Sequence, residues 1–305
     1  MTREALSASV DAMRAAGIDE PRLDAELLLC EATGWDRAYL AANPEAEIAP
    51  AAARRFGEMV RRRLRREPVA YILGRRGFRR IEPAVDPRVL IPRPETELLV
   101  ELALELRPRR VLDVGTGSGA IALAVADELP DVAVVATDTS AAALEVARAN
   151  ARRLGFAERV EFVEGTLPPR PYEFDLVLAN LPYVSEAEWG GLEPEVTEWE
   201  PREALLAGPD GLDAIRALLD VLPRRVRFSA RYPTAKANSA GAAVALEVGE
   251  RQAGMVEELM RGAGYAQIEV RRDLAGVERV VLGRPNPADF VFSGAIDPET
   301  SRRDG

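Results

Sequence analysis

The sequence contains no histidine and only one cysteine, Cys30, in 305 residues. The lack of histidine excludes catalytic triads with an imidazole base, and zinc or haem sites with histidine ligands. A single cysteine allows neither an internal disulfide nor a cysteine-rich metal site. We therefore predict no bound metal, and chemistry that proceeds without an imidazole base.

Long apolar runs are also missing. No stretch approaches the roughly 20 apolar residues that cross a membrane. The N-terminal residues 1–4 include an acid and lead into no apolar segment, so they do not resemble a secretory signal. The formal charge of −10 argues against a protein whose main partner is bare nucleic acid. These observations predict a cytoplasmic protein with neither a membrane nor a nucleic acid as its partner.

From about residue 94 to residue 284, strand and helix patterns alternate. The expected strands cover residues 110–114, 132–137, 160–163, 174–179, 242–248, 267–270 and 279–282. The expected helices cover residues 120–128, 141–153, 212–222 and 252–261. Such alternation predicts an α/β fold whose mostly parallel sheet has helices on both faces. The last two strands have no helix between them, so we expect a hairpin.

The N-terminal part has a different pattern. Apolar residues at helical spacing, beginning near Thr2, Pro21 and Ala51, predict a small helical bundle over residues 1–75. The third helix region carries seven arginines: Arg54, Arg55, Arg61, Arg62, Arg63, Arg65 and Arg66. They form either a solvated helix face or a basic patch for an acidic partner or RNA.

Three further segments connect or end these regions. Residues 69–74 and 89–91 are strand-like and flank a segment rich in Gly, Pro and Arg, so residues 76–93 are predicted to be a β-hairpin linker. Residues 224–241 are longer than a helix-to-strand turn requires, and we expect a mobile inserted loop. Residues 285–305 are polar at their end and are expected to be a disordered tail.

A glycine-rich segment follows the first expected strand. It begins with Asp113 and continues through Val114, Gly115, Thr116, Gly117, Ser118 and Gly119. The glycines let the backbone approach a ligand closely. A pyrophosphate-binding fingerprint would read G-x-G-x-x-G, whereas the spacing here is G-x-G-x-G after an acid. Asp113 would repel a pyrophosphate but can orient a cationic amino-acid group, which favours S-adenosylmethionine over NAD.

Two other strand ends carry candidate nucleotide contacts. Asp138 ends the second expected strand, where a carboxylate can accept both ribose hydroxyls. Its alternative role is the N-cap of the next helix, although Ser140 or Thr139 can serve there. Thr166 and Leu167 follow the third strand and are placed to flank an adenine.

A short apolar run, residues 174–179, ends in Asn180, Leu181, Pro182 and Tyr183. Pro182 keeps the preceding residue extended, so an amide, free backbone carbonyls and an aromatic ring gather at a strand's carboxyl end. Ligands bind at that edge of open α/β sheets. An ordinary strand-to-loop turn is the alternative interpretation.

Five segments together resemble the bacterial release-factor glutamine methyltransferases over about residues 5–284. They are residues 91–97 (Ile-Pro-Arg-Pro-Glu-Thr-Glu), 113–119, 180–183, 247–249 (Glu-Val-Gly) and 278–280 (Glu-Arg-Val). The first of these is specific to that family, and the others are shared by many methyltransferases. This chain departs from the usual family pattern in three places. The family motif is usually Asn-Pro-Pro-Tyr, so Leu181 replaces its first Pro. The family also usually has an acid near Thr166 and a shorter loop at 224–241.

The resemblance implies a class I S-adenosylmethionine-dependent methyltransferase fold, Rossmann-like with a seven-stranded mostly parallel sheet, in residues 94–284. It also implies that residues 1–75 form a helical domain that docks the substrate. The implied acceptor is the glutamine of the Gly-Gly-Gln motif in peptide-chain release factors. In that reaction Asn180 and the Leu181 carbonyl hold the amide, Pro182 fixes the loop and Tyr183 packs beside the acceptor.

Two other functions stay open from the sequence. Asn-Leu-Pro-Tyr also resembles the motif of ribosomal-RNA adenine dimethyltransferases, although those proteins are typically basic and carry their extra domain after the catalytic one. A module that only binds S-adenosylmethionine is the third possibility, and it would leave Asn180 and Tyr183 without a role.

Overall fold

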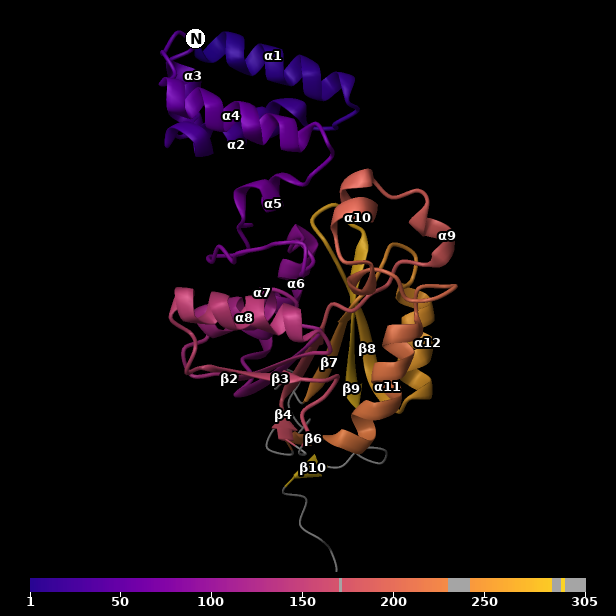
Figure 1. Ribbon diagram of the computed structural model, residues 1–305. Helices are drawn as coiled ribbons and strands as arrows, with labels where there is room; N and C mark the ends of the chain where they lie inside the picture. Colours follow the sequence, from indigo (N-terminus) through magenta and orange to yellow (C-terminus); the bar gives the residue numbers. More distant parts are fainter. Residues whose placement is uncertain (170–171, 230–241, 287–291, 294–305) are drawn as a thin grey trace, which may run out of the picture. The chain divides into compact units, whose positions relative to one another are not determined.

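The computed structural model describes residues 1–169, 172–229, 242–286 and 292–293 (Figure 1). These residues divide into two compact units. The helical unit contains Met1–Arg76, Val85–Pro87 and Leu192–Glu200. The sheet unit contains Gly77–Ala84, Arg88–Gly191 and the described residues from Pro201 onward. No helix in the described parts of the chain is both long enough and apolar enough to span a membrane.

The helical unit is built on α1 (Thr2–Ala15), α2 (Pro21–Thr33) and α4 (Pro50–Arg63), as the sequence predicted. Met13, Leu28, Leu29 and Phe56 form its buried core. Pro begins both α2 and α4, where its missing N–H costs no hydrogen bond. The short α3 (Arg37–Ala42) begins at the Asp36 N-cap, whose carboxylate accepts the Tyr39 N–H, and α10 (Pro194–Trp199) joins this unit from far along the chain.

The strand predicted at residues 69–74 is wrong, because this segment forms helix α5 (Val69–Leu73). Gly74, at φ 73°, ends that helix in the left-handed conformation. Short apolar runs do not distinguish a buried helix from a strand by periodicity, and that is the reason for the error. The segment of the expected hairpin contains an antiparallel bridge between Phe78 and Ile81, but residues 89–91 form no strand.

The sheet unit contains a seven-stranded sheet in the order β3-β2-β1-β5-β7-β9-β8. The strands are β1 (Arg110–Val114), β2 (Ala133–Asp138), β3 (Val160–Glu164), β5 (Leu176–Ala179), β7 (Ala243–Glu247), β8 (Tyr265–Arg272) and β9 (Glu278–Pro285). The first five are parallel, and β9 is antiparallel to both β7 and β8. The predicted mostly parallel sheet and its closing hairpin are both confirmed.

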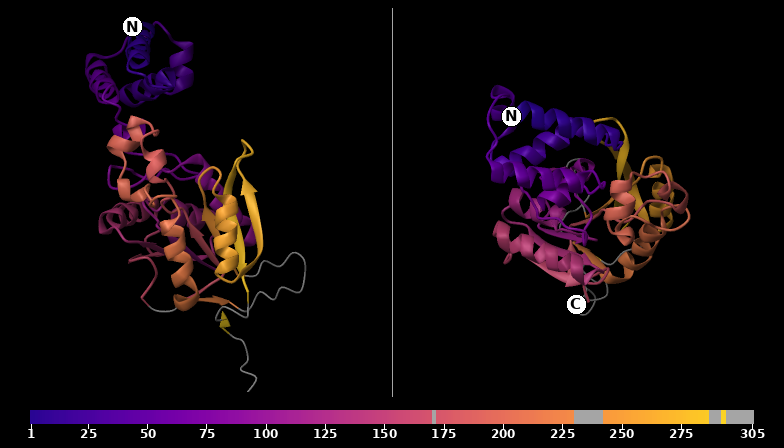
Figure 2. Two further views of the ribbon diagram at one scale, coloured as in Figure 1. Left: turned by 90° about the vertical axis from the view of Figure 1, so that its right-hand side faces the viewer. Right: turned by 45° about the horizontal axis from the view of Figure 1, so that its top comes forward.

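Alternate residues of each strand face different helices, because side chains of a strand point to opposite faces. Val111 packs in the cluster with α6 (Glu97–Leu106) and α7 (Ala120–Glu128), and α8 (Ala141–Leu154) covers the same face. Leu112 packs in the opposite cluster, with α11 (Asp213–Arg225) and α12 (Ala253–Gly262). Figure 1 shows these two layers of helices, and Figure 2 shows α12 lying along the yellow strands β8 and β9.

A second, three-stranded parallel sheet was not predicted. It has the order β10-β6-β4 and consists of β4 (Tyr172–Phe174), β6 (Val226–Ser229) and β10 (Phe292–Ser293). Part of the expected loop at 224–241 is therefore strand, and residues 230–241 lie outside the described residues. The tail predicted from residue 285 also lies mostly outside them, apart from the end of β9 and the β10 pair.

Three arginines of the expected basic face bind acids inside the helical unit, and Arg62 pairs with Glu67 at 2.5 Å. Arg63 Nε donates to Asp24 Oδ2 at 2.7 Å, and Arg63 Nη1 lies 2.6 Å from Glu195 of α10. Arg66 pairs with the same Glu195, at 2.5 Å. Because the Arg63 side chain is only 8% exposed, these pairs hold the segment around Glu195 against the bundle. Arg54, Arg61 and Arg65 are exposed, so only part of the face meets solvent.

We predict that Arg63→Ala loosens α2 and α10 far more than Arg61→Ala, an exposed arginine of the same helix. The substitution leaves the Asp24 carboxylate without its partner and removes one of the two arginines that bind Glu195. Removing one partner of a buried pair typically costs about 3–5 kcal/mol. Hydrogen exchange of the backbone amides in both helices should become at least about a hundredfold faster in Arg63→Ala. Equal exchange rates in the two variants would contradict this role.

Candidate functional site

The carboxyl ends of neighbouring parallel strands meet at one edge of the sheet. Val114 at the end of β1 is in register with Thr137 of β2 and with Ala179 of β5. A cavity of about 290 Å³ lies at this edge. Among the predicted site residues it is lined by Gly115, Gly117, Asp138, Thr166, Asn180, Leu181 and Pro182. The fold therefore brings together the nucleotide contacts and the Asn-Leu-Pro segment, which are separate in the sequence.

The glycine-rich loop turns tightly between β1 and α7. Gly115, Gly117 and Gly119 have φ values of 73°, 55° and 84°, a region that side chains rarely adopt. The backbone N–H groups of Gly115 and Thr116 both donate to the Thr137 carbonyl at 2.9 Å, which ties the loop to β2. A Cβ on Gly119 would lie 3.3 Å from the Ala147 Cβ, so this glycine also lets α7 approach α8.

Asp113 lies behind this loop and does not line the cavity. It is fully buried, and its Oδ2 accepts from the Thr116 hydroxyl at 2.6 Å and the Ala122 N–H at 3.2 Å. Its Oδ1 has no hydrogen-bond partner among the described residues. Burial raises the pKa of Asp113 to about 7. The carboxyl thus supports the loop, and a direct contact with a cationic ligand stays a prediction. Thr116 and Ser118 are also buried, at 5% and 3% exposure.

Asp138 ends β2 and faces the cavity. Its Oδ2 accepts from the Gly117 N–H and its Oδ1 from the Ser140 N–H, both at 2.9 Å. The N-cap of α8 is Ser140, whose hydroxyl accepts from the Ala143 N–H. Because a carboxylate has about four lone-pair positions, Asp138 keeps acceptors for two ligand hydroxyls. Thr166 lines the cavity, whereas Leu167 packs in the core and does not.

The segment after β5 enters the cavity from the other side. Asn180 Nδ2 donates to the Thr96 hydroxyl at 3.0 Å. Leu181 packs over the glycine loop, since its Cδ2 lies 3.1 Å from where a Cβ on Gly115 would be. The Tyr183 carbonyl accepts from Gln252 Nε2 at 2.9 Å, but its side chain does not line this cavity. Burial, and next the charge of Glu247, raise the pKa of Tyr183 to about 12.

Several cavity residues were not predicted. Val89 and Leu90 come from the linker, and Glu203 and Ala217 come from the region between β5 and β6. Neither group has a local pattern that identifies it, because the contacts depend on how distant segments pack. Thr96 and Glu247 were part of noted motifs, without any role assigned to them.

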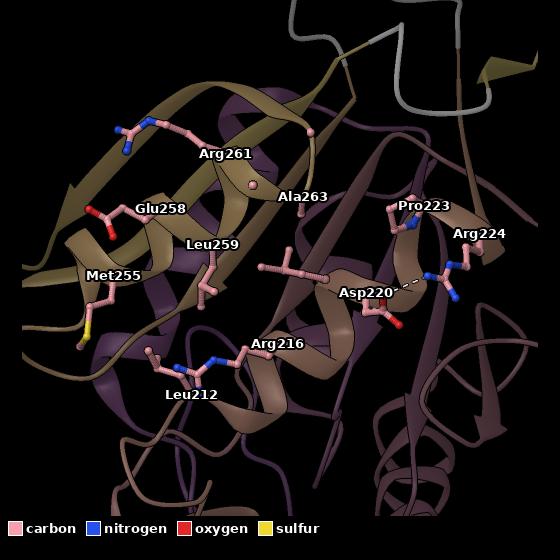
Figure 3. Close-up of a pocket in the computed structure, with 13 residues that line it drawn as sticks. Leu212, Arg216, Asp220, Pro223, Arg224, Met255, Glu258, Leu259, Arg261 and Ala263 are labelled. Carbon is pink, nitrogen blue, oxygen red and sulfur yellow. Dashed lines mark hydrogen bonds and ion pairs between the residues drawn. The ribbon is translucent and has the colours of Figure 1, made fainter.

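A wider cavity of about 1010 Å³ lies between α11 and α12 (Figure 3). It is lined by residues such as Arg216, Met255 and Leu259, and Asp220 and Arg224 form an ion pair at its edge. None of the predicted site residues lines it. The cavity at the strand ends is therefore the better candidate, despite its smaller volume.

The fold is that of a Rossmann-like methyltransferase. The catalytic domain of hMettl16, solved in complex with the MAT2A 3′UTR hairpin 6, has a TM-score of 0.51 and 14% identity, covering 68% of this chain and 77% of that one. At this identity the similarity shows the fold alone. A model described as the methyltransferase small domain matches residues 94–191, and one described as the PrmC N-terminal domain matches residues 4–74.

Relatives of known name extend over nearly the whole chain. The release factor glutamine methyltransferase of Moorella thermoacetica is 43% identical, covering 92% of this chain and 97% of its own. Those of Caulobacter vibrioides and Nitratidesulfovibrio vulgaris are 39% and 40% identical, covering 94% and 90% of this chain and 97% and 92% of their own. The chain therefore belongs to the release factor glutamine methyltransferase family, which confirms the resemblance seen in the sequence.

The protein is thus an S-adenosylmethionine-dependent methyltransferase, and the cavity fits that cofactor. Gly117 has nothing within 4 Å of the position of an added Cβ, so the loop leaves open space on its cavity side. Asp138 offers acceptors for ribose hydroxyls at the same edge. The assignment of individual residues to parts of the cofactor stays a prediction.

We predict that the Asp113 carboxyl makes stability depend on pH in the acid range. Its pKa is higher in the folded than in the unfolded chain, so its stabilising contribution is full below about pH 4 and is lost as the pH rises to about 7. Asp113→Asn keeps an oxygen for Thr116 and Ala122 but cannot ionise. Denaturant titrations between these pH values should show wild type losing stability relative to the variant, by at most about 1.4 kcal/mol per pH unit. Parallel curves would contradict the prediction.

Proposed function

We propose that this protein transfers a methyl group from S-adenosylmethionine to the side-chain amide nitrogen of the glutamine in the Gly-Gly-Gln motif of peptide-chain release factors. The observation that supports this most is the Asn180 carboxamide, which lines the cavity. Its nitrogen donates a hydrogen bond to the Thr96 hydroxyl, so its oxygen is available to accept a hydrogen bond from the substrate amide. The names of the relatives, each a release factor glutamine methyltransferase, support the choice of substrate. We also propose that the protein acts in the cytoplasm and that nucleic acid is not its substrate.

The residues that would hold the cofactor are those of the glycine loop and the neighbouring strand ends. Gly115 and Gly117 would lie against it through their backbone, Asp138 would accept from the ribose, and Thr166 would flank the adenine. Leu167, expected to flank the adenine too, would act only from the core behind the cavity. When bound, S-adenosylmethionine supplies a methyl group on a sulfonium, which is already a good leaving group. The chain therefore has to position the acceptor and needs no strong base.

An amide nitrogen is a poor nucleophile, because its lone pair is delocalised into the carbonyl. The Asn180 oxygen and the Leu181 carbonyl would each accept one hydrogen of the glutamine amide. This directs the nitrogen toward the methyl group and stabilises any pyramidal transition state. Pro182 limits the freedom of the loop, and Tyr183 would pack beside the acceptor. The proton leaves after methyl transfer, so the absence of histidine is no obstacle.

The competing activity is methylation of an adenine amino group in RNA, since Asn-Leu-Pro-Tyr also occurs in enzymes of that kind. The formal charge of −10 and the position of the helical unit before the sheet unit argue against it. Transfer of tritiated methyl to purified release factor and to ribosomal RNA distinguishes the two. We expect label on the release factor, none on a Gln→Ala variant of its Gly-Gly-Gln motif, and none on RNA. Label on RNA alone would overturn the proposal.

Asp138→Ala should weaken S-adenosylmethionine binding by at least about tenfold, because two acceptors for the ribose are lost. Glu164→Ala, at the end of the neighbouring strand but outside the cavity lining, is the matched control and should bind normally. Isothermal titration calorimetry measures both. An unchanged dissociation constant for Asp138→Ala would place the ribose contact elsewhere.

Asn180→Ala should lower kcat by about a hundredfold to a thousandfold while sparing cofactor affinity, since it removes an acceptor used in the transition state. Leu181→Pro restores the usual family residue and keeps the carbonyl, so its turnover should equal or exceed that of wild type. Single-turnover kinetics on a Gly-Gly-Gln peptide measure both. Wild-type turnover in Asn180→Ala would rule out the orientation mechanism.

We further propose that the helical unit docks the release factor away from the glutamine, through the exposed Arg54, Arg61 and Arg65. The cavity can read only the glutamine and its neighbours, so selection of one protein requires a second contact. Replacing the three arginines with Ala should raise KM for intact release factor at least about tenfold and leave KM for the peptide unchanged. Equal effects on protein and peptide would reject the docking role.

A further inference from the structure

The reactive orientation of Asn180 is not fixed by shape alone. The oxygen and nitrogen of a carboxamide are nearly equal in size, and rotating the group by 180° exchanges them. Only the oxygen can accept a hydrogen from a substrate amide, whereas an outward NH₂ would meet the substrate NH₂ with the wrong polarity. Some neighbouring group must therefore select one orientation.

Thr96 is the neighbour that contacts this carboxamide. It lies in the short 3₁₀ helix η1 (Pro94–Thr96), just before α6, and is 4% exposed. Its hydroxyl oxygen accepts a hydrogen bond from Asn180 Nδ2, with 3.0 Å between the two atoms. A hydroxyl, however, can donate as well as accept, so Thr96 by itself would satisfy either orientation of Asn180.

Glu247 removes this ambiguity. It ends β7, is 2% exposed, and hydrogen-bonds to the Thr96 side chain. Its Oε2 has no hydrogen-bond partner among the described residues. A carboxylate only accepts, so the single Thr96 hydroxyl proton is directed to Glu247. The lone pairs of Thr96 are then left for the Asn180 N–H, and the Asn180 oxygen is left for the substrate.

We propose that Glu247 and Thr96 are a positioning pair, which sets the polarity of the Asn180 carboxamide so that its oxygen faces the acceptor amide. The pair deepens the proposed function and rests on it. The hydrogen-bond chain also runs through three segments distant in sequence, and it joins the end of β7 and the start of α6 to the end of β5. Bonds in such a chain polarise one another, which strengthens the selected orientation.

Glu247 acts as an acceptor only while its carboxylate is ionised, and its surroundings set the pH range in which that holds. Burial raises the pKa of Glu247 to about 7, and Glu95 acts in the same direction. The Thr96 hydrogen bond, Arg279 and Arg93 favour the ionised form, and the nearby Tyr183 stays protonated. Assays at about pH 8.5 therefore test the pair with its carboxylate ionised.

The test begins with Thr96→Val, which keeps the shape and removes the hydroxyl, and Thr96→Ser, which restores the hydroxyl. On a Gly-Gly-Gln peptide, we expect kcat to fall at least about tenfold in Thr96→Val and to recover to within about threefold in Thr96→Ser. Glu247→Gln, which can donate as well as accept, should also lose kcat. The dissociation constant of S-adenosylmethionine should not change in any of them.

A double-mutant cycle separates positioning from support of the fold. If Thr96 acts through Asn180, Thr96→Val should not lower kcat any further in the Asn180→Ala variant. If Thr96 only supports the fold, Thr96→Val should lower kcat by the same factor in wild type and in Asn180→Ala. In ¹⁵N-labelled protein without any ligand, the Asn180 side-chain NH₂ should also exchange its hydrogens faster in Thr96→Val than in Thr96→Ser. Additive losses of kcat in the cycle, or a wild-type kcat in Thr96→Val, would reject the positioning role of Thr96 and Glu247. A wild-type enzyme inactive on the peptide would instead reject the proposed function.

Discussion

The site depends on the parallel register of β5 between β1 and β7. All four residues of β5 are buried, so its backbone can satisfy its hydrogen bonds only by pairing with both neighbours. That pairing ends at Ala179, and Pro182 prevents the chain from turning into a helix at once. Asn180 is consequently presented at the same edge as the glycine loop and Asp138. The central residues of the site, Gly115, Asp138 and Asn180, therefore all lie at strand ends of this sheet.

The loop that follows β5 is held by packing and hydrogen bonds from several sides. Gln252 donates to the Tyr183 carbonyl and accepts from the Gly249 N–H, both at 2.9 Å. The backbone at Gly211 also lies close to the Tyr183 carbonyl. Only glycine fits there, since a Cβ at Gly211 would lie 2.2 Å from the Tyr183 oxygen. Further along, Glu195 binds Arg63 and Arg66 within the helical unit. Within the sheet unit, the residue that ends the catalytic segment is thus restrained by Gln252, as a mechanism based on positioning requires.

The mostly parallel sheet, its closing hairpin and the family could be predicted from the sequence, because buried parallel strands and glycine turns leave local patterns. Asn180 and Asp138 could be predicted for the same reason, since each directly follows such a strand. The helix at 69–73 and strand β6 were missed, because their short apolar runs fit either state until tertiary contacts decide. The buried positions of Asp113 and Leu167 and the link from Thr96 to Glu247 depend on packing between distant segments, which no local pattern records. The same holds for the Tyr183 side chain, which lies outside the cavity lining.

The central claim is that Asn180 and the Leu181 carbonyl hold the acceptor amide by its two hydrogens. A crystal structure of the protein with S-adenosylhomocysteine and a peptide containing Gly-Gly-Gln tests it most directly. The claim predicts the glutamine Nε2 within about 3 Å of both the Asn180 Oδ1 and the Leu181 carbonyl oxygen. A glutamine amide bound in the cavity but held by other acceptors, with neither oxygen within about 4 Å, would contradict it.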